Sequence, residues 1–254
     1  MHVLVGHERA EEARGLMLEL FPEGFEEVER ADGIELAAYT NSGGEERLWQ
    51  AFGPGGAAPV EAGWAQAWKR FHRPVRIGPV WVGPPWCEPD PDALAIVVDP
   101  GQAFGTGGHS TTRLCLELLV GLEPTSLVDL GCGSGVLGIA AARLGFSPVT
   151  AIDLDPLAVE AARANAAANG VEIDVRHADM REAALPAADV AVANVTLEAV
   201  EALAQRVHSP RLVASGYLAS ERPAPRGWTA CDRREEGGWA ADLLERSERL
   251  PLSL

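Results

Sequence analysis

The chain has 254 residues, of which 47% are hydrophobic and 23% charged, enough apolar material for one large domain or a medium and a small one. Its 37 acidic and 21 basic residues give a formal net charge of −16, which disfavours nucleic acid and anionic membranes as partners and favours a basic protein. The four cysteines are far apart and form no C-x-x-C pair, so we expect buried thiols, no disulfide framework and no metal. The chain has neither ~18 consecutive apolar residues nor a signal pattern, which predicts a cytoplasmic protein.

The first part of the chain is strongly acidic. Residues 1 to about 60 hold 12 acidic and 4 basic residues, so about a quarter of the chain carries half of the net charge. This asymmetry predicts a separate unit. Its pattern indicates a strand at residues 2–5 and an amphipathic helix at residues 8–20. A hairpin with strands at residues 25–30 and 34–40 follows around Asp32-Gly33, and then a second helix at residues 45–52.

A Gly/Pro/Ala stretch at residues 53–59 ends this pattern, and a short helical segment is predicted at residues 64–71. A basic cluster overlaps the end of that segment and continues beyond it. We interpret it as the solvated face of a connector in preference to a binding patch; it consists of Lys69, Arg70, Arg73 and Arg76.

From residue 93 onward, short β-rich apolar runs alternate with helical ones. Strands are predicted at residues 94–98, 126–130, 149–153, 172–176, 189–194 and 211–215, and helices at residues 109–121, 136–144, 156–168 and 196–207. This βαβ series predicts an α/β domain with a parallel sheet. Residues 228–235 and 239–245, around Gly237-Gly238, are typical of an antiparallel hairpin.

The sharpest motif is D-L-G-C-G-S-G at residues 129–135, after a predicted strand and before a predicted helix. Gly131, Gly133 and Gly135 let the backbone approach a ligand at the helix N-terminus. A G-x-G-x-x-G spacing, completed by Gly138, makes a dinucleotide site an alternative. Asp129 favours a ligand with an ammonium group over a pyrophosphate. An acid at the strand end, two residues before the first glycine, also resembles the signature of class I methyltransferases that use S-adenosylmethionine (AdoMet).

Further polar residues end the following strands. Asp153 is placed to accept hydrogen bonds from both hydroxyls of a ribose, which fits NAD and AdoMet equally. Asp179 lies where this fold usually contacts an adenine amino group, and a helix N-cap or loop acid is an equal alternative. Asn194 ends the fourth strand, where its carboxamide can meet a reacting amine. Upstream, the glycine-rich residues 99–112 indicate a loop that folds closely over a ligand, with a hinge as the alternative.

Three segments in order, D-P-G-x-A-F-G-T-G-x-H-x-T-T, D-L-G-C-G-S-G and A-D-V-A-V-A-N-V, closely resemble the bacterial methyltransferases of a ribosomal stalk-base protein, protein eleven of the large subunit. The resemblance covers residues 60–220 well. It departs from the family at Gly108 and Ser110, where Thr and Pro are common, which leaves the role of His109 open. It implies a Rossmann-like methyltransferase domain with a mostly parallel seven-stranded sheet (91–254), a linker (56–90) and a small ferredoxin-like substrate-recognition domain (1–55).

The resemblance also implies AdoMet as cofactor, S-adenosyl-L-homocysteine as product, and lysine ε-amines and the N-terminal α-amine of the ribosomal protein as methyl acceptors. It implies catalytic roles for Thr106 and Asn194. It implies cofactor contacts for Phe104, Thr106, Gly107, Asp129, Gly131, Gly133, Gly135, Asp153, Asp179 and Asn194. Methyl transfer is expected to need a deprotonated, positioned amine and no covalent intermediate. His109 is a weak candidate for a general base, and we expect a monomer.

Other functions remain as alternatives. An NAD-dependent oxidoreductase is disfavoured because Lys69, the only lysine, precedes the nucleotide-binding part and forms no Tyr-x-x-x-Lys pair. Methyltransferases of glutamine or adenine usually carry N-P-P-Y, whereas residues 194–197 of this chain read N-V-T-L. A non-catalytic AdoMet sensor that binds protein through its acidic part is the remaining alternative.

Overall fold

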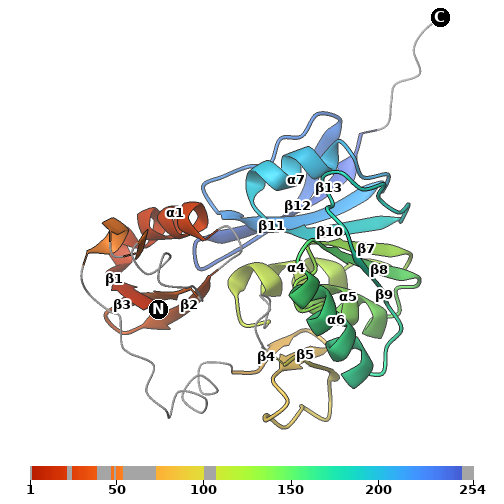
Figure 1. Cartoon of the computed structure of the whole chain (residues 1–254), viewed down its shortest axis with the longest axis horizontal. Coiled ribbons are helices and arrows are strands. Elements are labelled where there is room, and N and C mark those ends of the chain that lie inside the picture. The colour runs from red at the N-terminus through yellow and green to blue at the C-terminus, as the bar shows by residue number, and fades with distance from the viewer. Residues whose placement is uncertain are drawn as a thin grey trace, which may run out of the picture. The chain divides into compact units, whose positions relative to one another are not determined.

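The computed structural model describes residues 2–21, 25–38, 47, 48, 50–53, 73–99 and 107–247. Contacts between residues divide the chain into two compact units, residues 1–72 and 73–254 (Figure 1). The predicted helix at residues 64–71, with Lys69 and Arg70, lies outside the described residues. The predicted functional boundaries after residues 55 and 90 stay a prediction.

The first unit is built on a three-stranded antiparallel sheet of order β1-β3-β2. Its elements are β1 (His2–Val5), a 3-10 turn (His7–Arg9), α1 (Ala10–Leu20), β2 (Glu26–Arg30) and β3 (Gly33–Ala37). Met17 of the helix and Leu36 of the sheet are fully buried. Arg14 binds both carboxylate oxygens of Glu27, at 2.8 and 2.7 Å. This β-α-β-β order agrees with a small ferredoxin-like domain, of which the described residues hold three strands.

The second unit contains a seven-stranded sheet of order β12-β13-β11-β10-β7-β8-β9. The five strands from β11 to β9 run parallel, and the hairpin of β12 and β13 joins β11 in antiparallel pairing. The bounds are β7 (Leu127–Leu130), β8 (Val149–Asp153), β9 (Asp174–His177), β10 (Val190–Asn194), β11 (Arg211–Leu218), β12 (Trp228–Glu236) and β13 (Trp239–Arg246). The predicted α/β class and mostly parallel sheet are confirmed.

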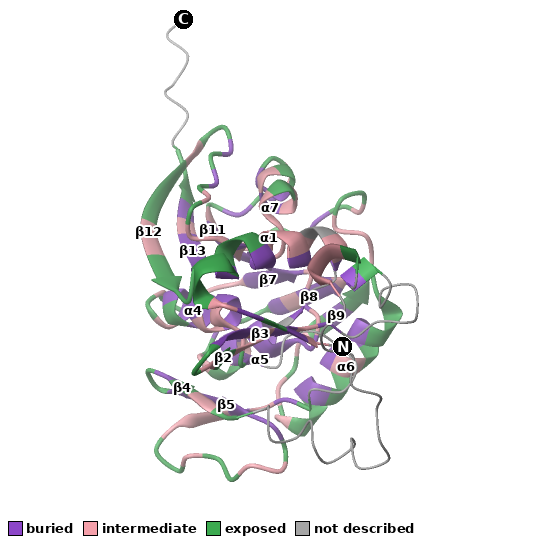
Figure 2. Ribbon diagram, turned by 90° about the vertical axis from the view of Figure 1, so that its left-hand side faces the viewer, coloured by how far each residue is buried: buried purple, intermediate pink, exposed green. Residues whose placement is uncertain are grey.

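Helices cover both faces of this sheet. They are α4 (Ser110–Val120), α5 (Val136–Arg143), α6 (Pro156–Ala168) and α7 (Leu197–Ala204), and α7 lies on the face opposite the other three (Figure 1). Covering both faces buries the central strands, which is why they read as continuous apolar runs in the sequence. The strand β7 is buried throughout (Figure 2), and the first four residues of β10 are buried as well.

A separate three-stranded sheet of order β4-β5-β6 precedes the large one. It consists of β4 (Val75–Ile77), β5 (Val80–Gly83) and β6 (Leu94–Val97). The strand that we predicted at residues 94–98 exists, but its assignment to the main βαβ series was wrong, because β6 pairs in parallel with β5. A short apolar run predicts a buried strand without predicting which sheet the strand joins.

Candidate functional site

Three predicted polar residues meet at one edge of the large sheet. Asp129, Asp153 and Asn194 lie at or near the carboxyl ends of the neighbouring strands β7, β8 and β10. In open parallel sheets, ligands bind at this edge. The strand order therefore brings these three residues to one edge of the sheet.

The D-L-G-C-G-S-G motif at residues 129–135, called the glycine-rich run from here on, begins at the end of β7 at the same edge. Gly131, Gly133 and Gly135 have φ angles of 76°, 52° and 81°, in the region that L-residues rarely adopt. A Cβ at position 131 would lie 2.9 Å from Val195 Cγ1, so this glycine also lets the segment after β10 approach the run. Gly135 is the N-cap of α5, and a Cβ there would lie 3.0 Å from Ala162 Cβ of α6.

Asp129 is almost fully buried, with 1% of its surface exposed. Its Oδ2 accepts a hydrogen bond from the Gly138 N–H at 3.0 Å, whereas its buried Oδ1 has no partner in the part of the chain that the structure describes. Burial raises the pKa of Asp129 to about 7; the bond from Gly138 opposes this and the charge of Asp153 adds to it. A buried carboxylate oxygen without a partner fits a cationic hydrogen-bond donor, as a ligand ammonium group would provide.

Asp153 faces the glycine-rich run from the end of β8. Its Oδ2 accepts from the Gly133 N–H at 2.8 Å and its Oδ1 from the Asp155 N–H at 2.9 Å. A carboxylate has about four acceptor positions, so each oxygen retains capacity for a further donor. This arrangement fits the expected pair of ribose hydroxyls.

Asp179 lies two residues after β9 and binds Arg181. Its Oδ1 accepts from the Arg181 backbone N–H at 2.8 Å, and its Oδ2 from the guanidinium at 2.9 Å. These bonds hold the pKa of Asp179 below its usual value. The carboxylate thus shapes its own turn, as the alternative interpretation proposed, and the adenine contact stays a prediction.

Asn194 is held from the side of α4. Its Nδ2 donates to the Thr112 Oγ1 at 3.4 Å, and Thr112 is 1% exposed.

Of the predicted residues upstream of α4, Gly107 has a φ of 83°, and a Cβ there would lie 2.4 Å from Val82 Cγ1. Phe104 and Thr106 lie outside the described residues.

His109 serves as the N-cap of α4. Its Nδ1 accepts from the Thr111 N–H at 3.3 Å, and its ring makes an edge-to-face contact with Trp239, with 4.9 Å between the centroids. Both contacts fix the start of the helix and the orientation of the ring. This geometry favours the structural interpretation of His109 over a general base.

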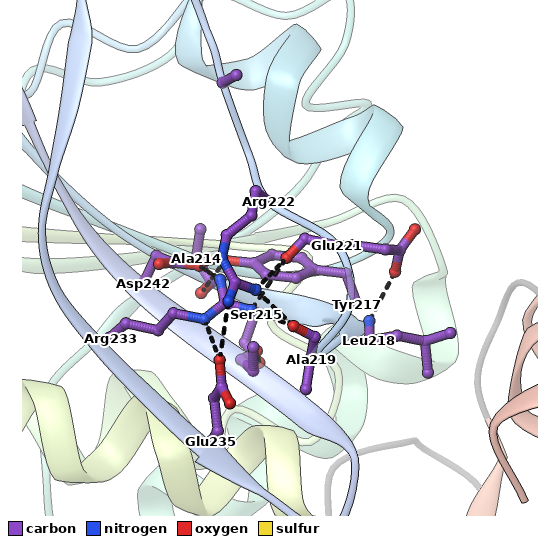
Figure 3. Close-up of polar contacts among 12 residues, drawn as sticks. Ala214, Ser215, Tyr217, Leu218, Ala219, Glu221, Arg222, Arg233, Glu235 and Asp242 are labelled. Atoms are coloured by element: carbon purple, nitrogen blue, oxygen red, sulfur yellow. Dashed lines mark hydrogen bonds and ion pairs between the residues drawn. The ribbon is translucent and has the colours of Figure 1, made fainter.

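A buried polar cluster near the end of β11 was not predicted from the sequence. Arg233 of β12 donates to Asp242 Oδ2 of β13 at 2.7 Å, and the Tyr217 hydroxyl donates to the same oxygen at 2.8 Å (Figure 3). Arg233 also binds the carbonyls of Ala219 and Glu221, at 2.8 and 2.9 Å. Burial and the charge of Asp242 raise the pKa of Tyr217. The cluster fixes the hairpin to the segment that follows β11.

The bulge in β11 begins at Ser215, which pairs with Asn194 of β10. The Val195 N–H donates to the Ser215 carbonyl at 2.9 Å. Gly216 has a φ of 101°, and a Cβ there would lie 2.2 Å from the Val195 carbonyl oxygen. Only glycine therefore allows β11 to pass this close to the residue after Asn194.

Neither a metal centre nor a membrane span emerges from the described ranges. No group of three or more His, Cys, Asp or Glu residues is arranged there to hold a metal ion. Likewise, no helix in these ranges combines the length and the apolar character needed to cross a membrane. Cys115 and Cys132 are buried thiols, and burial raises the pKa of both.

Comparison with known proteins decides the family. A family model described as ribosomal protein L11 methyltransferase matches residues 47–221. The chain belongs to the ribosomal protein L11 methyltransferase family. It is 44% identical over 199 residues to the ribosomal protein L11 methyltransferase of Symbiobacterium thermophilum, and 41% identical over 212 residues to that of Pelobacter propionicus. These matches cover 72% and 73% of this chain and 66% and 67% of the two relatives.

A solved structure supports the family fold. The ribosomal protein L11 methylase of Lactobacillus delbrueckii subsp. bulgaricus is 27% identical, with a TM-score of 0.62. The match covers 69% of this chain and the whole of that structure. The interpretation as an NAD-dependent oxidoreductase is therefore not supported.

Proposed function

We propose that the chain is an AdoMet-dependent protein methyltransferase. It transfers methyl groups to lysine ε-amines and the N-terminal α-amine of ribosomal protein L11 and releases S-adenosyl-L-homocysteine. The observation that carries this proposal is the buried Oδ1 of Asp129, which lacks a partner among the described residues and lies in the motif that opens onto the ligand edge of the sheet. Membership in the methyltransferase family supports the same reaction.

The residues of this edge fit the cofactor. Asp129 binds the ammonium group, Asp153 the ribose hydroxyls and Asp179 the adenine amino group, while Gly131, Gly133 and Gly135 let the backbone approach closely. Further contacts come from Phe104, Thr106, Gly107 and Asn194. When bound, AdoMet supplies an electrophilic methyl group on a sulfonium. No metal takes part in this proposal.

Asn194 acts on the methyl acceptor. Its Nδ2 donates to Thr112, which leaves its Oδ1 available to accept a hydrogen bond from an amine N–H. Such a bond orients the amine lone pair, and orientation is the main contribution that an amine nucleophile needs. A lysine ammonium that is buried beside a cation has a lowered pKa, which increases its neutral fraction. Thr106 is the second proposed catalytic residue, and the proton of the amine passes to bulk water or to a carbonyl.

The acidic first unit recognises the protein substrate in this account. Residues 1 to about 60 hold 12 acidic and 4 basic residues, and ribosomal proteins are generally basic, so complementary charge raises the encounter rate. We assign substrate recognition to residues 1–55, the connection to 56–90 and catalysis to 91–254. We further propose that the protein is a cytoplasmic monomer that binds no nucleic acid.

Replacement of Asp153 tests the cofactor site. The charge-assisted hydrogen bonds of such a carboxylate contribute about 1.5–3 kcal/mol, so Asp153→Ala is expected to weaken AdoMet binding by one to two decades in calorimetry. Asp174→Ala, which removes an exposed acid from the neighbouring strand β9, is the matched control and should bind normally. Unchanged affinity in Asp153→Ala would remove the ribose assignment.

A further inference from the structure

Two asparagines on α6 and at its end bind the open edge of β6. The Asn169 side chain accepts from the Val97 N–H at 2.8 Å and donates to the Val97 carbonyl at 2.6 Å. The Asn165 Oδ1 accepts from the Asp99 N–H at 3.1 Å. Four helical residues rise ~6 Å and two strand residues ~6.6 Å. The spacing of Asn165 and Asn169 along the helix therefore matches the spacing of Val97 and Asp99 along the extended segment.

Asn165 has a second contact that Asn169 lacks. Its Nδ2 donates to the Ser134 carbonyl at 3.0 Å, inside the glycine-rich run. The Nδ2 of Asn169 instead donates to the carbonyls of Val97 and Asn165. One carboxamide therefore joins Asp99, the first residue of the glycine-rich segment 99–112, to the run at residues 129–135.

Asn165 is a buried polar residue whose hydrogen bonds lie outside its own helix. Asn165 is 4% exposed and Ser134 is fully buried, so the bridge lies inside the protein. Asn forms helices less readily than the alanines on either side of it. Both the donor and the acceptor of its amide are satisfied, each by a different motif segment. The residue therefore links two segments at some cost to the helix that carries it.

We propose that Asn165 is a positioning residue for cofactor binding. It holds the Asp99 backbone and the glycine-rich run at a fixed separation, so that the run keeps the backbone position in which it meets AdoMet. The inference rests on the proposed function, because it takes AdoMet as the ligand of the glycine-rich run. Asn165 acts through the backbone of Asp99 and Ser134.

The test uses the full chain and three substitutions. Asn165→Ala removes both contacts, and Asn165→Asp keeps an acceptor for the Asp99 N–H but replaces the donor to Ser134. Asn169→Ala is the matched control, because it removes contacts to β6 and leaves the glycine-rich run untouched. AdoMet affinity is measured by calorimetry, and KM and kcat by methyl transfer to ribosomal protein L11.

Both Asn165 variants should bind AdoMet at least about tenfold more weakly, because each loses at least the hydrogen bond to Ser134, worth about 1.4 kcal/mol. The KM for AdoMet should rise with kcat within about twofold, as for a loss of uniform binding. Asn169→Ala should change the affinity less than about threefold, although it also removes buried hydrogen bonds. A merely structural role would affect Asn165 and Asn169 variants alike.

The outcomes separate the inference from the function on which it rests. Wild-type affinity in the Asn165 variants, or an equal loss in Asn169→Ala, would overturn the bridge while AdoMet binding by the native chain still stands. Failure of the native chain to bind AdoMet would overturn the proposed function and the inference together. If Asn165→Ala does not fold, Asn165→Asp decides, because it preserves the volume of the side chain.

Discussion

AdoMet affinity is expected to rise with pH between pH 5 and pH 7, because Asp129 must lose its proton before it pairs with a ligand ammonium group. Burial raises the pKa of Asp129 to about 7; the bond from Gly138 opposes this and the charge of Asp153 adds to it. A bound ammonium group favours the ionised carboxylate. Ligand binding is therefore coupled to the release of a proton from Asp129.

The size of the effect follows from this pKa. Below a pKa of about 7, each pH unit lowers the ionised fraction of Asp129 about tenfold, so the affinity at pH 5 should be about 100-fold below its maximum. The ligand's own α-amino group, with an ordinary pKa of ~7.7–8.0, stays charged over this range. Above pH 8 its deprotonation lowers the affinity again.

Calorimetry in buffers of different ionisation heat measures both the affinity and the protons released. The native chain should release close to one proton per AdoMet at pH 6. Asp129→Asn should show neither this proton release nor the rise of AdoMet affinity between pH 5 and pH 7. Asp174→Asn, an exposed acid on β9 that pairs with Arg176, is the control and should behave like the native chain. A pH-independent affinity in the native chain, or the same slope in Asp129→Asn, would refute the assignment of Asp129.

Two further predictions concern the first unit and the hairpin. A chain that begins near residue 58 should still bind AdoMet but methylate ribosomal protein L11 far more slowly, since the acidic residues that attract the substrate are removed; undiminished methylation would show that they are dispensable. Arg233→Ala should lower the free energy of unfolding by about 3–5 kcal/mol in urea titrations, because it leaves the buried Asp242 without its cation. Arg234→Ala, which breaks the exposed pair with Asp232 and a long hydrogen bond to the Arg233 carbonyl, should cost at most about 1 kcal/mol, and equal losses would contradict this role for Arg233.

Local signals predicted the elements around the site well. The strand at residues 149–153 and the helix at residues 156–168 have the bounds of β8 and α6. Asp155 and Pro156 account for this accuracy, because the Asp155 side chain accepts from the Leu157 N–H at 2.9 Å and Pro156 occupies the first turn. Such signals act within a few residues and need no knowledge of the fold.

Features that depend on long-range packing were missed. The pairing of β6 with β5 cannot be deduced from either strand alone. The cluster of Tyr217, Arg233 and Asp242 is assembled from three strands, and none of the three residues belongs to a local motif. The bridge of Asn165 left a usable signal, because this polar residue shares the buried face of α6 with Ala158 and Ala162.

Transfer of label from methyl-labelled AdoMet to ribosomal protein L11, with intact mass and peptide mapping of the product, tests the central claim most directly. The product should gain mass in multiples of one methyl group, located on lysine side chains and the N-terminal amine, and Asn194→Ala should be strongly impaired although it still folds. AdoMet binding by the native chain without any label on ribosomal protein L11 would instead identify a sensor and contradict the account.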